Sequence, residues 1–468
     1  MIIMQSGSTL PEHDYCRRFA DVTSRGRGWN GCTQATTGVA AINIDGTTIN
    51  TGLAIPKEAG DNVPAMSDQK KTQLRLSLAD LKLIIIDEIS MVGNTTLLHI
   101  HQRLKDIFGT TSSLLFAGIS IIVVGDLCQL PPIRKRFIFD SYKNEIYNLC
   151  HPWMLFKMIE LIQIMRQKNY QAFIELLNRV RTVTQTEDMK IIQSRSISPD
   201  DPSYPSDALH IWAENAPVNE HNKNKLEELS GSLFILKAKD QYPTNVRKQD
   251  IDRVLARGRS ETGGLDYEIL IKGGARVMLT TNINISDRLI NGQIGTVFKV
   301  DVNQSSQKPI VLYIKFDDPN AGKDLINTHG KPFAREYSVV PIEPVLAKIK
   351  VRPGKASSPE IQIVQFPITL AWACTVHKVQ GLTLEKVVLS SDLIKQRAFN
   401  YGQLYVALSR ATSLRGLYIL GQIESKHIKA NPKVLEEYER LRNECIVPHL
   451  TTVPQDNFNV LTISLLNI

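Results

Sequence analysis

The chain has 468 residues, enough for about three domains, and a formal net charge of +8. Its 43% hydrophobic and 22% charged residues are typical of a folded globular protein, and no apolar run approaches a membrane-spanning helix. The six scattered cysteines favour reduced thiols over a disulfide scaffold or a metal site, and the positive charge mildly favours a polyanionic partner.

Two glycine-containing stretches near the start of the chain could bind phosphate. G-R-G-W-N-G-C-T (26–33) has the spacing of a phosphate loop, but Cys32 replaces the lysine. No apolar strand enters this stretch and no helix has room to follow, so we interpret it as a linker. The stretch T-T-G-V-A-A places Thr37 and Gly38 at a strand-to-helix turn. Amides exposed at such a turn suit a phosphate of a nucleic-acid backbone.

Two continuous apolar runs predict buried parallel strands, with a helix over 95–108 between them. The first strand, in L-K-L-I-I-I-D-E, ends in Asp87 and Glu88. Parallel sheets bind ligands at this end of their strands, and in nucleotide hydrolases such carboxylates hold Mg²⁺ and position water. The second strand ends in Gly125-Asp126 and is followed by Gln129, whose neutral amide suits a γ-phosphate sensor. The alternative for this second motif is a buried strand with a tight turn.

The next part of the chain predicts a helix over 170–183, a proline-rich loop over 196–207, and then a strand and a helix. From Gly273 the pattern changes to alternating apolar and polar residues separated by turns such as Asn291-Gly292. This pattern predicts a small antiparallel barrel. The α/β pattern then resumes at F-P-I-T-L-A-W-A-C-T, so the barrel is predicted to be an insertion.

Polar residues also cluster after two later strands. T-V-H-K-V-Q-G gathers five polar or flexible residues between apolar segments, namely Thr375, His377, Lys378, Gln380 and Gly381. Y-V-A-L-S-R-A places Arg410 after a helical turn and before an apolar strand. A guanidinium at this place suits the stabilisation of a transferring phosphoryl group, and a structural ion pair is the alternative.

Taken in order, T-T-G-V-A-A, I-I-I-D-E-I-S-M, G-D-L-C-Q-L-P-P, I-M-R-Q, T-V-H-K-V-Q-G-L-T-L and Y-V-A-L-S-R-A resemble the petite-integration-frequency (PIF) family of DNA helicases. These are superfamily-one motors related to the RecD helicases. The resemblance implies an α/β fold with two RecA-like parallel-sheet domains of the P-loop NTPase type, and an SH3-like β-barrel inserted in the second. It implies a first domain over 1–150, the second over 151–272 and 363–425, the barrel over 273–362, and a C-terminal helix and tail over 426–468.

The resemblance also implies a role for each matching residue. The family uses ATP and Mg²⁺ to move 5′-to-3′ along single-stranded DNA and to unwind duplexes in repair, recombination and telomere maintenance. Asp87 would bind Mg²⁺, Glu88 would activate water, and Gln129 would sense the γ-phosphate. Arg166 and Arg410 would stabilise the transition state. The DNA backbone would contact Thr37, Gly38, Thr375, His377 and Lys378, while Gln380 and Gly381 would couple this DNA track to the nucleotide.

One departure from the family is the phosphate loop G-x-x-x-x-G-K-[ST], which this sequence lacks. Its loss would remove several hydrogen bonds to the phosphates of ATP, each of about 1.5–3 kcal/mol. The first domain would then be incomplete, without an inner strand and with an exposed edge. Two alternatives to a working helicase stay open: an ATPase-dead remnant that binds single-stranded nucleic acid, and an incomplete piece of a larger helicase or mobile-element replicase.

The expected partners are single-stranded DNA and duplex junctions, without a membrane. The resemblance implies a monomer in the nucleus, with the mitochondrion as the alternative.

Overall fold

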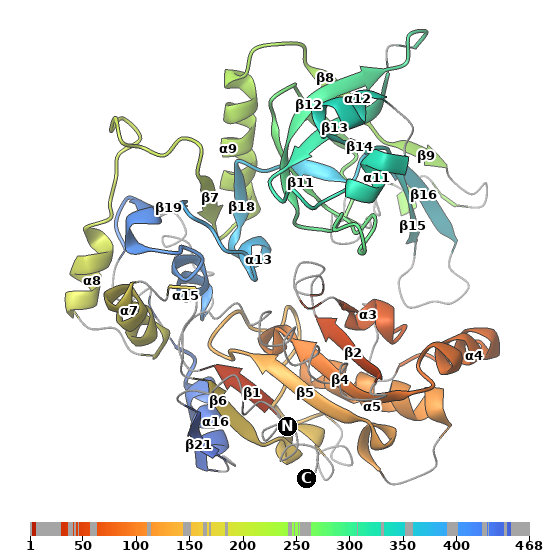
Figure 1. Cartoon of the computed structure of the whole chain (residues 1–468), viewed down its shortest axis with the longest axis vertical. Helices are drawn as coiled ribbons and strands as arrows, with labels where there is room; N and C mark the ends of the chain where they lie inside the picture. Colours follow the sequence, from red (N-terminus) through yellow and green to blue (C-terminus); the bar gives the residue numbers. More distant parts are fainter. Residues whose placement is uncertain are drawn as a thin grey trace. The chain divides into compact units, whose positions relative to one another are not determined.

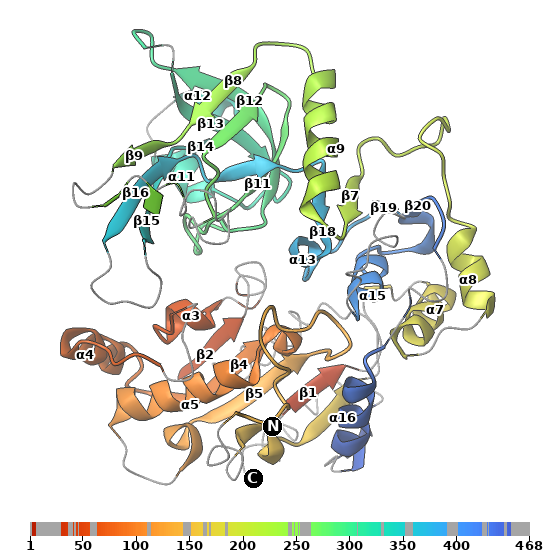
Figure 2. The same cartoon turned by 180° about the vertical axis from the view of Figure 1, so that it is seen from behind.

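The structure is a computed structural model that describes residues 2–5, 30–35, 41, 44, 46–56, 63–109, 114–143, 151–161, 166–167, 170–182, 186–241, 246–247, 249–250, 252, 264–306, 308–328, 332–351, 359–390, 401–423, 428, 430–443 and 447–450. The chain forms two compact units: unit 1 contains Met1–Ser206 and Val379–Ile468, and unit 2 contains Asp207–Lys378. Figures 1 and 2 show the elements from opposite sides. Within the described ranges, no helix has the length and apolar character needed to span a bilayer.

Unit 1 is built on a parallel seven-stranded sheet in the order β21-β6-β1-β5-β4-β2-β3. Its strands are β1 (Ile2–Gln5), β2 (Asn30–Ala35), β3 (Thr47–Thr48), β4 (Leu81–Asp87), β5 (Ser120–Gly125), β6 (Met158–Leu161) and β21 (Val447–Leu450). The two strands predicted from continuous apolar runs are therefore confirmed as β4 and β5. The α/β class is confirmed with them.

The apolar runs of β4 and β5 are buried because both faces of the sheet are covered. Ile84 and Ile86 belong to one core cluster, and Leu83 and Ile85 belong to another on the opposite face. The first cluster includes Leu97, Ile100 and Leu104 of α5 (Asn94–Phe108), the helix predicted over 95–108, which lies along the sheet in both views (Figures 1 and 2). Side chains alternate along a strand, so a run that is apolar at every position requires cover on both sides.

The other strands of unit 1 form a second, smaller parallel pair. The pair consists of β19 (Val387–Ser390) and β20 (Leu417–Leu420). The other helices are α3 (Ile49–Gly52), α4 (Asp68–Ser77), α7 (Gln171–Thr182), α8 (Thr186–Gln193), α15 (Gln403–Leu408) and α16 (Pro432–Asn443). Short 3-10 helices occur at Ile89–Met91, Leu115–Gly118, Pro152–Leu155 and Leu414–Gly416. The helix predicted over 170–183 is confirmed as α7.

The prediction that the first sheet lacks an inner strand is wrong. Ile2–Gln5 form β1, which pairs in parallel with β5 on one side and with β6 on the other (Figure 1). A strand of four residues is sufficient here because neighbours on both sides satisfy its backbone groups. The strand therefore covers the edge of β5 that was expected to be exposed.

The glycine-rich stretch 26–33 is not a phosphate loop. Gly31, Cys32 and Thr33 lie inside β2, where they pair with Leu83, Ile84 and Ile85. A phosphate loop connects a strand to a helix and turns its amides toward the ligand, whereas amides inside a strand bind the neighbouring strands. The rejection of this near-match is confirmed, while its interpretation as a linker is wrong for these three residues.

Unit 2 contains antiparallel sheets and one parallel strand pair. A five-stranded sheet has the order β14-β13-β12-β11-β17, a three-stranded sheet has the order β15-β16-β9, and β10 pairs with β8. The antiparallel strands are β8 (Phe234–Lys237), β9 (Lys239–Gln241), β10 (Glu268–Ile271), β11 (Arg276–Leu279), β12 (Ile294–Val302), β13 (Pro309–Phe316), β14 (Val340–Ile342), β15 (Val345–Lys350), β16 (Glu360–Gln365) and β17 (Ile368–Leu370). The predicted antiparallel texture is confirmed, and the pairing extends beyond 273–362 on both sides.

The parallel pair of unit 2 joins β7 (Leu209–Trp212) to β18 (Ala373–Thr375). The helices of the unit are α9 (Asn215–Glu228), α11 (Lys323–Thr328), α12 (Pro332–Tyr337) and α13 (Val376–Val379). The last residue of α13, Val379, begins the second segment of unit 1. The core of the antiparallel region includes Val277 and Leu279 of β11 and Leu312 and Ile314 of β13, the two strands on either side of β12. The loop predicted over 196–207 precedes β7 and contains no helix or strand.

Candidate functional site

The predicted Mg²⁺ ligand, Asp87, is the last residue of β4, and Glu88, the carboxylate predicted to activate water, follows it. Asp87 is fully buried, and its Oδ1 accepts a hydrogen bond of 2.8 Å from the backbone N–H of Glu88. Glu88 has a left-handed backbone with φ 55° and ψ 50°, a conformation that costs a non-glycine residue on the order of 1–3 kcal/mol. This turn lies against Gly125 at the end of β5, where a Cβ atom would be 2.9 Å from the N atom of Ile89. The close approach of β5 therefore requires glycine at this position.

Glu88 and Gln380 are brought together although they are far apart in the sequence. Glu88 Oε2 accepts a hydrogen bond of 2.9 Å from Gln380 Nε2, and both side chains are buried, at 2% and 4% exposure. Gln380 Nε2 also lies 3.4 Å from Ser90 Oγ. Gly381 follows with a positive φ of 82°, which lets the chain turn directly after this contact. The amide of Gln380 thus fixes the orientation of the carboxylate that is predicted to act on water.

The predicted phosphate sensor, Gln129, lies in a tight turn after β5. Its backbone N–H donates to the carbonyl oxygen of Asp126 at 2.9 Å, and the residue is 4% exposed. Gly402, which precedes α15, packs directly against this turn, since a Cβ atom there would be 2.6 Å from the carbonyl oxygen of Gln129. The position of Gln129 is therefore set by the turn and by the start of α15.

The two predicted transition-state arginines converge on Ser409. Arg166 donates from Nε to Thr383 Oγ1 at 2.9 Å and from a terminal nitrogen to the carbonyl oxygen of Ser409 at 3.2 Å. Arg410 is 1% exposed and donates to Ser409 Oγ and to the carbonyl oxygen of Val406, each at 2.9 Å. Both guanidinium groups are thereby held at the end of α15. The structure brings together two arginines that lie more than 240 positions apart.

Three of the predicted DNA-contact residues lie at the end of unit 2. Thr375 is the last residue of β18, and His377 and Lys378 lie in α13 directly after it. Burial lowers the pKa of His377, so its imidazole is neutral near pH 7. Asn222 of α9 fixes the backbone of β18, because its side chain accepts from the N–H of Ala373 at 2.8 Å and donates to the carbonyl of Ala373 at 3.1 Å. The other two predicted contacts, Thr37 and Gly38, lie outside the described residues.

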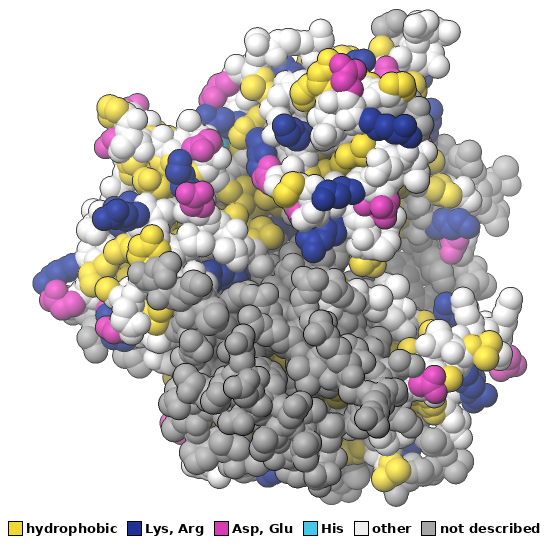
Figure 3. All heavy atoms as spheres, viewed as in Figure 1, with side chains coloured by type: hydrophobic (Ala, Val, Ile, Leu, Met, Phe, Trp, Pro, Cys, Tyr) yellow, Lys and Arg dark blue, Asp and Glu magenta, His cyan; other side chains and the backbone are white. Residues whose placement is uncertain are grey.

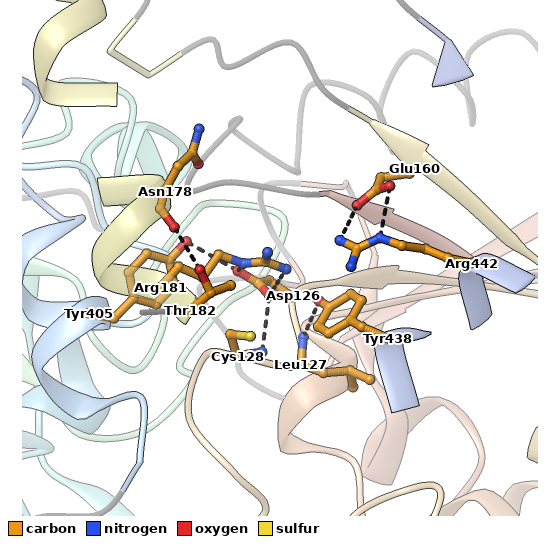
Figure 4. Close-up of polar contacts among 10 residues, drawn as sticks. All are labelled: Asp126, Leu127, Cys128, Glu160, Asn178, Arg181, Thr182, Tyr405, Tyr438 and Arg442. Atoms are coloured by element: carbon orange, nitrogen blue, oxygen red, sulfur yellow. Dashed lines mark hydrogen bonds and ion pairs between the residues drawn. The ribbon is translucent and has the colours of Figure 1, made fainter. Parts of the chain in front are cut away.

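A buried polar cluster next to Gln129 was missed by the sequence reasoning. Asp126, Arg181, Tyr405 and Tyr438 lie together at the end of β5 (Figure 4). Arg181 Nε and a terminal nitrogen donate to the two carboxylate oxygens of Asp126 at 2.9 and 2.8 Å. The hydroxyl groups of Tyr405 and Tyr438 donate to the same carboxylate at 3.1 and 2.7 Å. One indication of this cluster was present in the sequence, namely Arg181 near the end of the apolar pattern of α7. Its partner, Asp126, lies 55 positions earlier in the sequence, so the pair could not be recognised.

The protonation states in this cluster follow from burial and from neighbouring charges. Burial alone would raise the pKa of Asp126, but the charge of Arg181 and the surrounding hydrogen bonds outweigh it and lower the pKa. Burial and the charge of Asp126 raise the pKa of Tyr405 and Tyr438 well above the usual value. The carboxylate is therefore ionised and both phenols remain hydrogen-bond donors.

The chain is similar to known proteins of one family. A family model described as PIF1-like helicase matches residues 20–190. The ATP-dependent DNA helicase PIF1 of Danio rerio is 30% identical over 415 residues, which cover 88% of this chain and 57% of the relative. The ATP-dependent DNA helicase RRM3 of Saccharomyces cerevisiae is 27% identical over 463 residues, which cover 87% of this chain and 60% of the relative. The chain thus spans less than two thirds of the length of these curated relatives.

Solved structures show the same fold. The Pif1 helicase from Candida albicans has a TM-score of 0.73 with 23% identity, and the match covers 95% of each chain. The Pif1 helicase from Bacteroides in complex with ADP-AlF3 and ssDNA has a TM-score of 0.65 with 25% identity, and the match covers 94% of this chain and 93% of that one. The predicted RecA-like class of parallel sheets is confirmed by these neighbours, while the SH3-like identity of the inserted region stays a prediction.

Proposed function

Because the chain belongs to the PIF1-like helicase family, we propose that it is an ATP-dependent DNA helicase that moves 5′-to-3′ along single-stranded DNA and unwinds duplexes. The observation that carries the proposal is the hydrogen bond between Gln380 and Glu88. It joins the motif that contains the predicted DNA contacts to the carboxylate predicted to activate water. A change at the DNA track therefore has a direct route to the hydrolytic group. Repair, recombination and telomere maintenance are the processes in which we expect this activity to serve.

The residues at the end of the parallel sheet fit a nucleotide. ATP with Mg²⁺ supplies the phosphoryl group to be transferred and a cation that neutralises its charge. Asp87 would hold the metal, and one carboxylate is sufficient because Mg²⁺ usually takes its other ligands from phosphates and water. Accordingly, no group of three or more His, Cys, Asp or Glu side chains among the described residues is arranged to hold a metal alone.

The other predicted groups have separate roles in hydrolysis. Glu88, oriented by Gln380, would accept the proton of the attacking water. Gln129 would hydrogen-bond the γ-phosphate, and Arg166 and Arg410 would stabilise charge on the transferring group. Both arginines are held by neutral oxygen atoms around Ser409, so they are already positioned at the end of one helix. Preorganisation of this kind lowers the cost of reaching the transition state.

The surface of unit 2 supports single-stranded DNA as the partner. Lys and Arg side chains are spread over this face of the unit among exposed hydrophobic ones (Figure 3). Phe298 and Tyr337 are 46% and 43% exposed, their ring centroids lie 5.3 Å apart, and Lys299 Nζ lies 4.5 Å from the ring centre of Phe333. Exposed aromatic rings beside lysine suit base stacking and backbone contact. We propose that Thr375, His377 and Lys378 contact the backbone of the same strand.

We propose duplex junctions as a further substrate and a monomer as the active form. A solved Pif1 structure of two coordinating helicases at forked dsDNA supports the junction as a substrate, whereas it gives no support to the proposed monomer. Nuclear location, with the mitochondrion as the alternative, stays a prediction.

The second candidate function is an ATPase-dead protein that binds single-stranded nucleic acid. The observation that favours it is the missing Lys-Ser or Lys-Thr of the phosphate loop. An unwinding assay separates the two functions, using a duplex with a 5′ or a 3′ single-stranded tail, ATP and Mg²⁺. We expect the chain to unwind only the 5′-tailed duplex, and Glu88→Gln to unwind neither. Binding of the tail without any unwinding would favour the second function.

A further inference from the structure

We propose that Asp126 is a positioning residue that fixes Gln129 relative to α15, and that Tyr438 of α16 completes its anchor. The inference rests on the proposed function, because it assigns a role in ATP hydrolysis to residues that do not touch the nucleotide. It also gives the C-terminal helix α16 a part in the motor. The residues concerned all lie in unit 1 (Figure 4).

The backbone of the turn after β5 is fixed at three successive amides. The N–H of Leu127 donates to the hydroxyl oxygen of Tyr438 at 3.0 Å, and the N–H of Cys128 donates to Asp126 Oδ1 at 3.0 Å. The N–H of Gln129 donates to the carbonyl oxygen of Asp126 at 2.9 Å. Every amide from 127 to 129 is therefore held by Asp126 or by the phenol bound to it. These hydrogen bonds fix the backbone of the turn, and therefore the direction in which the side chain of Gln129 leaves it.

The same carboxylate binds side chains from three helices. It accepts five hydrogen bonds: two from Arg181 of α7, one from Tyr405 of α15, one from Tyr438 of α16, and one from the N–H of Cys128. The guanidinium carbon of Arg181 also lies 4.8 Å from the centre of the Tyr438 ring. Because all four side chains are buried, loss of one partner leaves a desolvated polar group without its hydrogen bond.

Helix α15 contacts the turn through its first residues and carries Arg410 after its other end. At its start, Gly402 has a φ of 80°, and a Cβ atom there would be 2.5 Å from the carbonyl oxygen of Cys128. Tyr405 then donates to Asp126, and Arg410 follows after the end of the helix with its Nε bound to the carbonyl of Val406. The predicted phosphate sensor and the predicted arginine finger are thus on two elements that the Asp126 cluster joins. Hydrolysis of a phosphoryl bond would depend on the relative position of these two groups.

Tyr438→Phe is the most informative variant, because it keeps the ring and removes the hydroxyl that holds both Leu127 and Asp126. Asp126→Asn leaves Arg181 buried beside a neutral group and carries a greater risk of misfolding. Tyr418→Phe is the matched control: Tyr418 also lies in unit 1, its ring faces Arg195, and it is outside the proposed site. All variants are made in the full chain.

The test is the steady-state ATP turnover of these variants with saturating single-stranded DNA. For Tyr438→Phe we expect kcat to fall about 10- to 100-fold, while KM for ATP and the Kd for single-stranded DNA change less than about threefold, because a misplaced group affects the transition state more than binding. Hydrogen exchange should become faster at the amides of 127–129 and stay unchanged in β4. Tyr418→Phe should match the wild type in every measurement.

Two results would overturn the inference alone. One is a folded Tyr438→Phe with wild-type kcat, and the other is an equal loss of kcat, of DNA affinity and of protection in β4, which would show general destabilisation. Absence of ATP turnover in the wild type would instead overturn the proposed function, and this inference with it.

Discussion

His210 shows how burial sets the charge of a single residue. It is 1% exposed at the start of β7, and its ring lies 4.2 Å from that of His221, centroid to centroid. Burial, with the neighbouring His221, lowers the pKa of His210 to about 3 from an ordinary value of 6.5. The unfolded chain therefore binds a proton at this residue between these two pH values, while the folded chain does not. Stability contributed by neutral His210 is fully present above pH 6.5 and decreases as the pH falls.

We predict that acidification from pH 7.5 to pH 5 lowers the free energy of unfolding by up to about 2 kcal/mol through His210. In His210→Gln this group no longer titrates, so the free energy of unfolding of the variant should decrease less between pH 7.5 and pH 5 than that of the wild type. Thermal unfolding of both proteins at the two pH values measures the difference. Parallel pH profiles for the two proteins would contradict the assignment.

Predictability at this scale depended on where the partners of a residue stand in the sequence. The sequence allowed us to propose Asp87, Glu88 and Gln129 as site residues. Each ends or follows an apolar run, and such runs form the inner strands of the parallel sheet. The buried cluster around Asp126 could not, because Arg181, Tyr405 and Tyr438 come from distant helices and each is unremarkable in its own sequence context. Arg410 could be proposed from its place between a helical turn and an apolar strand, whereas Arg166 was predicted only through the family resemblance. The convergence of both on Ser409 could be seen only in the fold.

Elements with long, uniform patterns could be predicted from the sequence alone. β4, β5 and α5 have many buried apolar side chains at a regular spacing, so local preference and tertiary packing agree. β1 was missed because four residues at the start of the chain provide too short a pattern. The weakly amphipathic strands β8 and β9 were missed for a similar reason, since only Leu236 of the four residues of β8 is buried. Such strands depend on their neighbours for stability.

We predict that Ile3→Pro destabilises unit 1. Ile3 pairs with Val124 of β5 and with Ile159 of β6, so proline at this position removes an inner-strand donor at a cost of about 1–3 kcal/mol. Ile3→Val keeps the backbone N–H and is the control. Urea unfolding measures the loss as a lower midpoint for the proline variant only. Equal midpoints for the two variants would mean that β1 does not hold its place in the sheet.

At the scale of the whole molecule, the candidate hydrolytic groups lie in unit 1. The candidate DNA contacts among the described residues are the last residues of unit 2 in the sequence. The sequence predicted that these residues follow strand ends, because parallel α/β units place their functional residues there, but it did not predict where the two units divide. The extent of the antiparallel region was not predictable, because its short strands pair across long stretches of sequence. The missing phosphate-loop motif is a property of the sequence, and it predicts weak ATP binding, since lost hydrogen bonds to phosphate raise the Kd.

The most direct test of the central claim is the rate of ATP hydrolysis by the 468-residue chain, with and without single-stranded DNA, at saturating ATP and Mg²⁺. We predict that DNA stimulates turnover and that Glu88→Gln reduces it by about 100-fold or more, because a positioned general base contributes at least this factor. Turnover no greater than that of Glu88→Gln, together with DNA binding that weakens steeply with salt, would contradict the claim and identify an ATPase-dead nucleic-acid-binding protein.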